Sequence, residues 1–162
     1  MQVYADNAAT TKMSTVAINA MLPYFQDIYA NPSSLHSAGQ AAKEALENAR
    51  ETIARCIGCE PREIYFTSGG SEADNQAIIS AARIGERKGK KHIISTAFEH
   101  HAVLHTLKRL EKEGFEVTLL DVSKNHNITA DQVKDALRED TCLVTCMYAN
   151  NEIGSVLPIA QI

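Results

Sequence analysis

Short apolar segments alternate with helical patterns from residue 63 onward, and this alternation is the strongest constraint on the fold. We expect strands at 63–67, 92–96, 115–121 and 142–148, and helices at 71–87, 101–113 and 130–139. Thr129 and Gln132 predict a capping box at the start of the last of these helices. Apolar strands separated by helices of this length are typical of βαβ units. The sequence therefore predicts an α/β fold of three layers, with a mostly parallel sheet between helices.

The residues before this alternation predict an extended arm and two helices. Residues 1–13 have no helical period, and Ser14 is a candidate cap for a helix running to about Tyr24. A long amphipathic helix follows and is expected to end at Gly58. We expect 1–162 to be one domain, with 1–13 as its arm. The last strand is followed by no closing helix, so we also expect the sheet to belong to a larger fold.

Composition narrows the classes of function. The 162 residues carry a formal net charge of −4, which argues against a nucleic-acid binder. No apolar run reaches bilayer length and the N-terminus does not resemble a signal peptide, so a cytoplasmic, non-membrane protein is expected. The four cysteines and the His101–His105 pair could bind a metal, but we expect no metal site.

A glycine-rich turn follows the first predicted strand. Ile64 to Phe66 form a short apolar run, and Gly69, Gly70 and Ser71 come before a helical pattern. The unpaired N–H groups of a helix start attract anions, and Ser71 adds a hydroxyl donor. We interpret this turn as a phosphate site. The alternative is an ordinary turn in which Ser71 and Asp74 form a capping box.

Two further polar clusters follow predicted strands, at 99–101 and at 150–152. Open α/β sheets bind ligands beyond the carboxyl ends of their strands, so these clusters are expected to meet the glycine-rich turn. His100 could stack on a flat ring or move a proton, and Asn151 offers an amide. The alternatives are a helix-start histidine and a turn asparagine. Ser33, Ser34 and His36 lie in a loop that could line the mouth of a site or cap the start of a helix.

Five segments together carry a resemblance to a known family. They are DNAATT at 6–11, NPSSLHSAG at 31–39, FTSGGSEADN at 66–75, EHHAV at 99–103 and NNEIG at 150–154. In this order and spacing they resemble the N-terminal part of cysteine desulfurases of the NifS/IscS type. These belong to the class V aminotransferase group of enzymes that use pyridoxal 5′-phosphate (PLP) and share the fold type I large domain. The resemblance covers essentially the whole chain.

The resemblance implies roles for four residues. Gly70 and Ser71 occupy the positions that hold the cofactor phosphate, although family members often have Ala-Thr there. His100 matches the catalytic histidine that stacks on the pyridine ring, and Asn151 matches the asparagine near the ring hydroxyl. His101 stands where some relatives carry lysine. Glu152 belongs to the motif without a physical role that we can name.

The implied reaction converts L-cysteine to L-alanine and leaves persulfide sulfur on the enzyme, for iron–sulfur clusters or another sulfur acceptor protein. Family members are homodimers, and their Schiff-base lysine and nucleophilic cysteine follow the region that matches this chain. We therefore expect the chain alone to be inactive. The alternatives are a non-catalytic binding or dimerising module that keeps the fold, and a related class V enzyme such as a selenocysteine lyase.

Overall fold

Three parallel strands form a sheet within residues 67–162. The computed structural model describes residues 1–122 and 127–162. Strand β1 (His92–Thr96) lies between β2 (Glu116–Leu120) and β3 (Thr141–Val144). Ile93 pairs with Val117 on one side and with Leu143 on the other. The parallel sheet is confirmed, with β1 as predicted and β2 and β3 shorter than expected.

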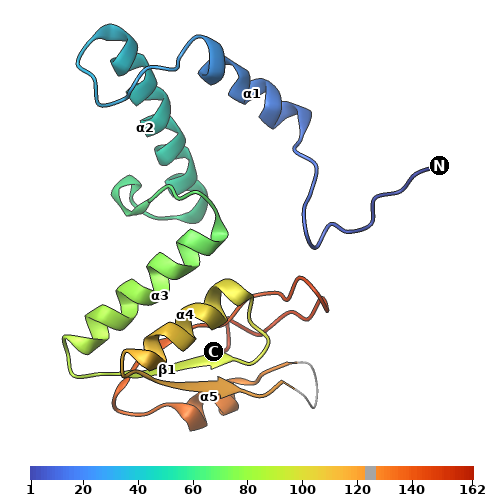
Figure 1. The fold of residues 1–162 in the computed structure, drawn as a ribbon, viewed down its shortest axis with the longest axis vertical. Coiled ribbons are helices and arrows are strands. Elements are labelled where there is room, and N and C mark those ends of the chain that lie inside the picture. Colours follow the sequence, from blue (N-terminus) through green and yellow to red (C-terminus); the bar gives the residue numbers. More distant parts are fainter. Residues whose placement is uncertain (123–126) are drawn as a thin grey trace. The chain divides into compact units, whose positions relative to one another are not determined.

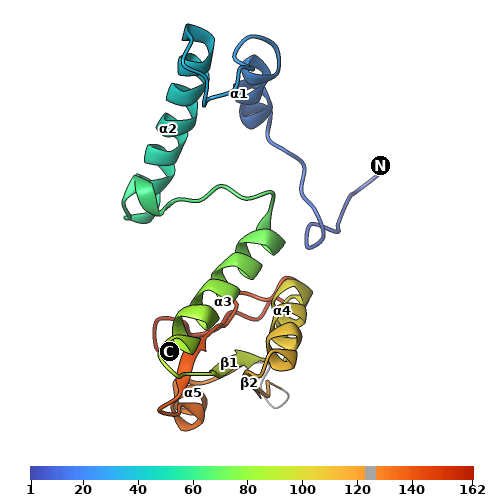
Figure 2. The same cartoon turned by 60° about the vertical axis from the view of Figure 1, so that its left-hand side comes forward.

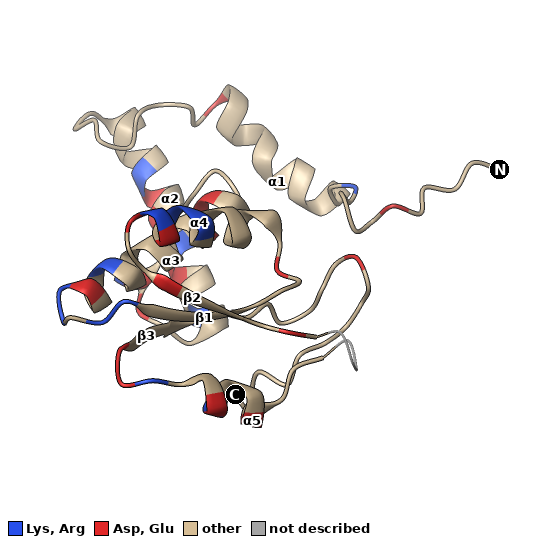
Figure 3. Cartoon of the chain, turned by 60° about the horizontal axis from the view of Figure 1, so that its bottom comes forward, with Lys and Arg blue, Asp and Glu red and all other residues tan. Residues whose placement is uncertain are grey.

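Helices cover both faces of this sheet, because neighbouring residues of β1 point to opposite sides. Ile93 packs with residues of α3 (Gly70–Glu86) and α4 (His101–Lys112), whereas Ile94 packs with residues near and within α5 (Ala130–Ala136). Figure 3 shows α3 and α4 on one side of the strands and α5 on the other. The predicted three layers are confirmed. Figure 2 shows α3 and α4 side by side along the sheet.

The helices of this region follow from local sequence and close packing. Thr129 and Gln132 form the predicted capping box at the start of α5. Gly85 in α3 lies against β3 so closely that an added Cβ would be 2.2 Å from the Cβ of Cys142. A side chain at position 85 would therefore push α3 away from the sheet.

Residues 1–66 are helical and contain few buried side chains. They form α1 (Thr15–Gln26), α2 (Ser37–Ile57) and the 3-10 turn η1 (Pro61–Glu63), which Figure 1 shows in blue to green. Ser14 accepts a hydrogen bond from the Ala17 N–H, and Gly58 ends α2 with a φ of 74°. Both predicted helix boundaries are confirmed. His36 caps α2 by accepting a hydrogen bond from the Gly39 N–H. Of the two roles considered for His36, the structure therefore shows the helix cap.

The predicted strand at 63–67 is wrong. Residues 64–67 have no regular secondary structure, and Tyr65 is 73% exposed. A strand needs a neighbouring strand to pair its backbone, and no other strand in the described ranges pairs with this segment. Instead, the Arg50 guanidinium donates to the Ile64 carbonyl and lies 5.0 Å from the centre of the Phe66 ring.

The chain divides into two compact units, residues 1–66 and 67–162. The expectation of one domain over 1–162 with an arm at 1–13 stays a prediction. Among the described residues, none of the helices combines the length and apolar character needed to cross a bilayer.

Candidate functional site

Helix α3 begins at Gly70, and the backbone of its N-cap, Gly69, is extended. The capping box of Ser71 and Asp74, which was the alternative interpretation of this turn, does not form among the described residues. The Glu72 carboxylate reaches back one turn instead, and its Oε2 accepts from both the N–H and the hydroxyl of Ser68, each at 2.6 Å. These two hydrogen bonds lower the pKa of Glu72 because they stabilise its charged form.

The first turn of α3 keeps its other donors free. In the described part of the chain, the N–H groups of Gly70, Ser71 and Glu72 and the Ser71 hydroxyl have no hydrogen-bond partner, and all three residues are exposed. These groups lie at the positive end of the helix dipole. The turn can therefore hold a phosphate, although the Glu72 carboxylate is a competing negative charge beside it.

His100 starts helix α4 and is held in one orientation. Its Nδ1 accepts a hydrogen bond from the Ala102 N–H at 3.1 Å. A neutral ring therefore carries its proton on Nε2, the nitrogen that faces away from the helix cap. His100 is therefore a helix-start histidine, as the alternative interpretation held. This capping role leaves the ring face and Nε2 available to a ligand.

Asn151 lies in a turn that follows β3. Asn150 closes this turn, because its Oδ1 accepts from the N–H groups of Glu152 and Ile153 at 2.8 and 2.9 Å. The exposed Asn151 side chain has no hydrogen bond in the part of the chain that the structure describes. Its amide is therefore free to bind a ligand.

Two adjoining pockets connect these residues. One has a volume of about 360 Å³ and is lined by Ser71, Asn75 and Thr106, among others. The other has a volume of about 330 Å³ and is lined by residues that follow β1 and β3, including Asn151. His100 and His101 line both pockets. Gly70 lines neither pocket. Ser71 lines only the first and Asn151 only the second, so His100 is the predicted site residue that links them.

Known proteins match the sequence of nearly the whole chain. The family model for aminotransferase class V matches residues 3–162. The chain belongs to the aminotransferase class-V family. A cysteine desulfurase IscS from Methanosarcina thermophila is 49% identical to this class-V chain over 160 residues, which is 99% of the chain and 39% of the relative.

Solved structures agree with the sequence matches. A NifS-like protein is 38% identical, with a TM-score of 0.93 over 98% of this chain and 43% of its own. A structure of SspA in complex with cysteine is 41% identical, with a TM-score of 0.91 over 98% of this chain and 46% of its own. The class-V chain thus has the fold of NifS-like proteins and spans about two fifths of the length of its relatives.

The sequence did not reveal how α3 and α4 are tied together beside the pockets. The Thr106 hydroxyl donates to Asn75 Oδ1 at 2.6 Å, and Asn75 Nδ2 donates to the Ser71 carbonyl at 2.7 Å. This chain of contacts links the helix that carries Ser71 to the helix that begins after His100. Thr106 is only 3% exposed, and its one sequence signal is a polar residue on the apolar stripe of Val103, Leu107 and Leu110.

The two cysteines in the sheet region of this class-V chain, Cys142 and Cys146, are poor nucleophiles. Burial raises the pKa of Cys142 and raises that of Cys146 to about 11, so both thiols stay protonated at neutral pH. The Cys142 thiol donates to the His92 carbonyl at 3.3 Å. All four cysteines are free. Half-buried, protonated thiols behave as small hydrophobic residues. Cys142 lies in a strand as predicted, whereas Cys146 follows the end of β3 at Val144.

Proposed function

We propose that this chain supplies the PLP-binding part of a cysteine desulfurase. The observation that carries the proposal is the pair of adjoining pockets, with His100 between Ser71 on one side and Asn151 on the other. Relatives named cysteine desulfurase IscS and the cysteine complex of SspA support the choice of L-cysteine as substrate. The assignment of individual residues rests on the family resemblance together with the geometry described above.

The start of α3 is the proposed phosphate site. The unpaired N–H groups of Gly70, Ser71 and Glu72 and the Ser71 hydroxyl are the donors that a phosphate requires. Glu72 is held back by Ser68, so its carboxylate oxygen Oε2 is already engaged. The residues present therefore fit an anionic group.

His100 and Asn151 are the proposed partners of the cofactor ring. The His100 ring is fixed by its bond to the Ala102 N–H and can present its face to a flat aromatic ring. Its Nε2 can hold or give up a proton, which makes it the catalytic candidate. The free amide of Asn151 can hydrogen-bond a ring hydroxyl.

PLP supplies an electron sink when it is bound. The chain's own contribution is to hold the anion, to orient the ring and to carry a proton at His100 Nε2. We propose that an enzyme thiolate takes the sulfur of L-cysteine and that L-alanine is released. The raised pKa values of Cys142 and Cys146 argue that neither is this thiolate.

The finer parts of the proposal concern partners. We include a homodimer and a sulfur acceptor protein, which the family resemblance implies. We also include a role in iron–sulfur cluster assembly, which the relatives named IscS support. A cytoplasmic location is part of the same proposal. A selenocysteine lyase and a non-catalytic dimerising module are the competing functions.

A binding titration tests the site. We expect PLP to bind the chain and the Ser71→Ala variant to bind it about tenfold more weakly, since one bond to a charged group is lost. Ser80→Ala, an exposed serine of the same helix, is the matched control and should bind like the parent. Pyridoxal, which lacks the phosphate, should bind both variants equally. Equal PLP affinity for Ser71→Ala and Ser80→Ala would contradict the phosphate assignment.

A chemical test addresses the catalytic part. Reduction with borohydride followed by mass spectrometry should find no PLP attached to one particular lysine of the chain. Sulfide release from cysteine by the chain alone should also be absent. Release of sulfide that is lost in Cys142→Ala or Cys146→Ala would overturn the argument that these thiols take no part.

A further inference from the structure

Two buried polar residues lie beside the candidate site without contacting a ligand in the proposal. Glu99 and Asn150 are each 7% exposed. Glu99 directly precedes His100, and Asn150 directly precedes Asn151. Each is therefore one residue away from a proposed ring-binding side chain, in the loops that follow β1 and β3.

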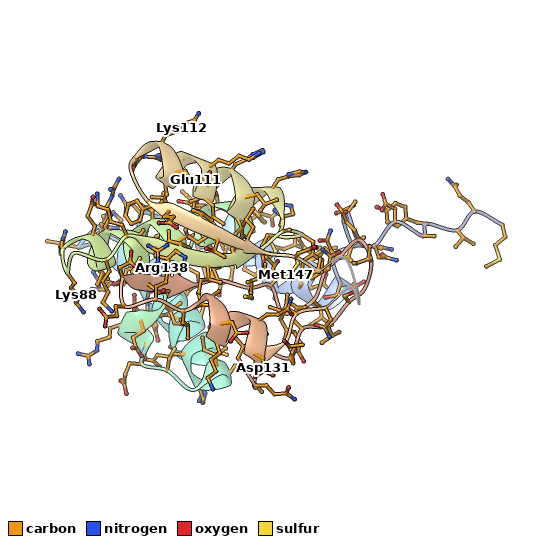
Figure 4. All side chains as sticks on the ribbon, turned by 90° about the horizontal axis from the view of Figure 1, so that it is seen from below. Lys88, Glu111, Lys112, Asp131, Arg138 and Met147 are labelled. Carbon is orange, nitrogen blue, oxygen red and sulfur yellow. The ribbon has the colours of Figure 1, made fainter. Side chains whose placement is uncertain are left out.

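Each of these side chains reaches the backbone of the other loop. Glu99 Oε1 accepts from the Met147 N–H at 2.6 Å, and Asn150 Nδ2 donates to the Phe98 carbonyl at 2.9 Å. Thr96 at the end of β1 supports Glu99 by donating to the same Oε1 at 3.0 Å. Met147, which Figure 4 labels, follows the last residue of β3, Val144, by three residues, so the contact lies just beyond the carboxyl end of that strand.

We call the two hydrogen bonds between the loops, from the Met147 N–H to Glu99 and from Asn150 to the Phe98 carbonyl, the latch. A hydrogen bond to a charged partner is stronger than a neutral one, and a buried pair that loses one member leaves the other unsatisfied. Burial raises the pKa of Glu99, which means that the fold bears a cost to keep an ionisable group at this position. Such a cost is understandable where the group positions a site.

We propose that Glu99 and Asn150 are positioning residues whose latch holds His100 and Asn151 at one pocket. The role of this latch in cofactor binding rests on the proposed function. The hydrogen bonds that form it are present in the chain without a cofactor. Without the latch, the loop after β1 and the loop after β3 share fewer contacts, and the pocket that His100 and Asn151 line loses its fixed width. The latch residues act through their neighbours and need not touch a cofactor.

The first test reads the latch without any cofactor. In Glu99→Ala we expect the Met147 amide to exchange its hydrogen at least about tenfold faster, because its acceptor is gone. NMR signals of the His100 ring and of the Asn151 side chain should shift as well. Glu99→Gln keeps a carbonyl oxygen for Met147 and Thr96, so it should restore the parent spectrum. Glu111→Ala, an exposed glutamate of α4 that Figure 4 labels, is the control.

The second test reads the consequence for binding. Glu99→Ala and Asn150→Ala should each weaken PLP binding about tenfold, whereas Glu99→Gln should bind like the parent. Because both side chains serve one latch, the double variant should lose less than the sum of the two single losses. If the two residues served stability alone, Glu99→Ala, Asn150→Ala and Glu99→Gln would all lower the melting temperature by the same amount. Glu99→Gln would then not restore PLP affinity.

The two tests separate failure of the inference from failure of the proposed function. If the parent chain does not bind PLP, the proposed function fails, and the amide and ring signals still decide the latch. If Glu99→Ala releases the Met147 amide while the His100 and Asn151 signals stay unchanged, the positioning role is overturned. Additive losses in the double variant would also contradict a shared latch.

Discussion

The two units of the chain differ in how their helices are supported. In residues 1–66, α1 has no buried residue, and in α2 only Gly39 and Ala54 are buried. In residues 67–162, all five residues of β1 are buried, and both core clusters pack on its two faces. Helix caps are well formed in both units. The comparison teaches that local sequence specifies helices, whereas burial depends on partner surfaces that only a sheet supplies here.

Hydrogen exchange should show the largest contrast between the two units. Amides of α1 should exchange faster than those of β1 by a factor on the order of a thousand, because α1 can open without exposing a buried core. Amide exchange followed by mass spectrometry or NMR on the whole chain measures this factor. Equal protection of α1 and β1 would break the comparison, since it would mean that α1 has a burying partner.

Matched core substitutions should show the next largest effect. Ile93→Ala should lower the free energy of unfolding by about 2–5 kcal/mol, because Ile93 is fully buried between α3, α4 and the neighbouring strands. Ile57→Ala in α2 removes the same atoms from a side chain that is 67% exposed and should cost less than about 0.5 kcal/mol. Chemical denaturation followed by circular dichroism measures both. A cost for Ile57→Ala above that for Ile93→Ala would reverse the comparison.

The same contrast explains how much of the fold could be predicted from the sequence. Ser14, Gly58 and the Thr129–Gln132 box were predicted because caps depend on residues within one turn. The strand at 63–67 was predicted wrongly, because a strand needs a partner strand, and residues near it in sequence do not reveal whether that partner exists. The apolar run there has the composition of a strand, but the Arg50 side chain takes up its backbone carbonyl instead.

The candidate site also has features that could be predicted from the sequence and features that could not. That the loops after β1 and β3 meet was predictable, because parallel strands end at the same edge and β3 lies next to β1. The latch was not predictable, since Glu99 and Met147 are 48 residues apart and no motif links a side chain to a backbone amide at that distance. The Glu72 contact with Ser68 was also missed, because the only side-chain cap considered for this turn was the alternative box of Ser71 and Asp74.

Substitutions of one glycine in each unit should change the free energy of unfolding by an intermediate amount. Gly85→Ala should lower the free energy of unfolding by about 1–3 kcal/mol, because the added Cβ meets Cys142 at 2.2 Å. Cys142→Ala in the same chain should recover only part of this loss, since the Cys142 Cβ remains. Gly58→Ala meets no atom within 4 Å, so its cost of about 1 kcal/mol comes from the backbone φ of 74°. The Gly58→Ala loss should not respond to Cys142→Ala.

The pH dependence of stability should give the smallest effect, through His92. This histidine is fully buried in β1, where its Nδ1 contacts the Thr141 hydroxyl at 2.7 Å and its Nε2 contacts the Thr118 hydroxyl at 2.9 Å. Burial lowers the pKa of His92, and Arg138 lowers it further, while Asp140 and Glu116 oppose the shift. The folded protein therefore holds this ring neutral at a pH where the unfolded chain binds a proton.

The sign of the effect follows from this difference in pKa. Above pH about 6.5 both states are neutral at His92 and its contribution to stability is complete. As the pH falls below that value, the unfolded state takes up a proton first, so the free energy of unfolding should fall by up to about 1.4 kcal/mol per pH unit. The slope should disappear in His92→Gln and persist in His36→Gln, which replaces an exposed histidine of the other unit. Urea denaturation between pH 7.5 and 5.5 measures it, and an unchanged slope in His92→Gln would show that other groups cause the acid sensitivity.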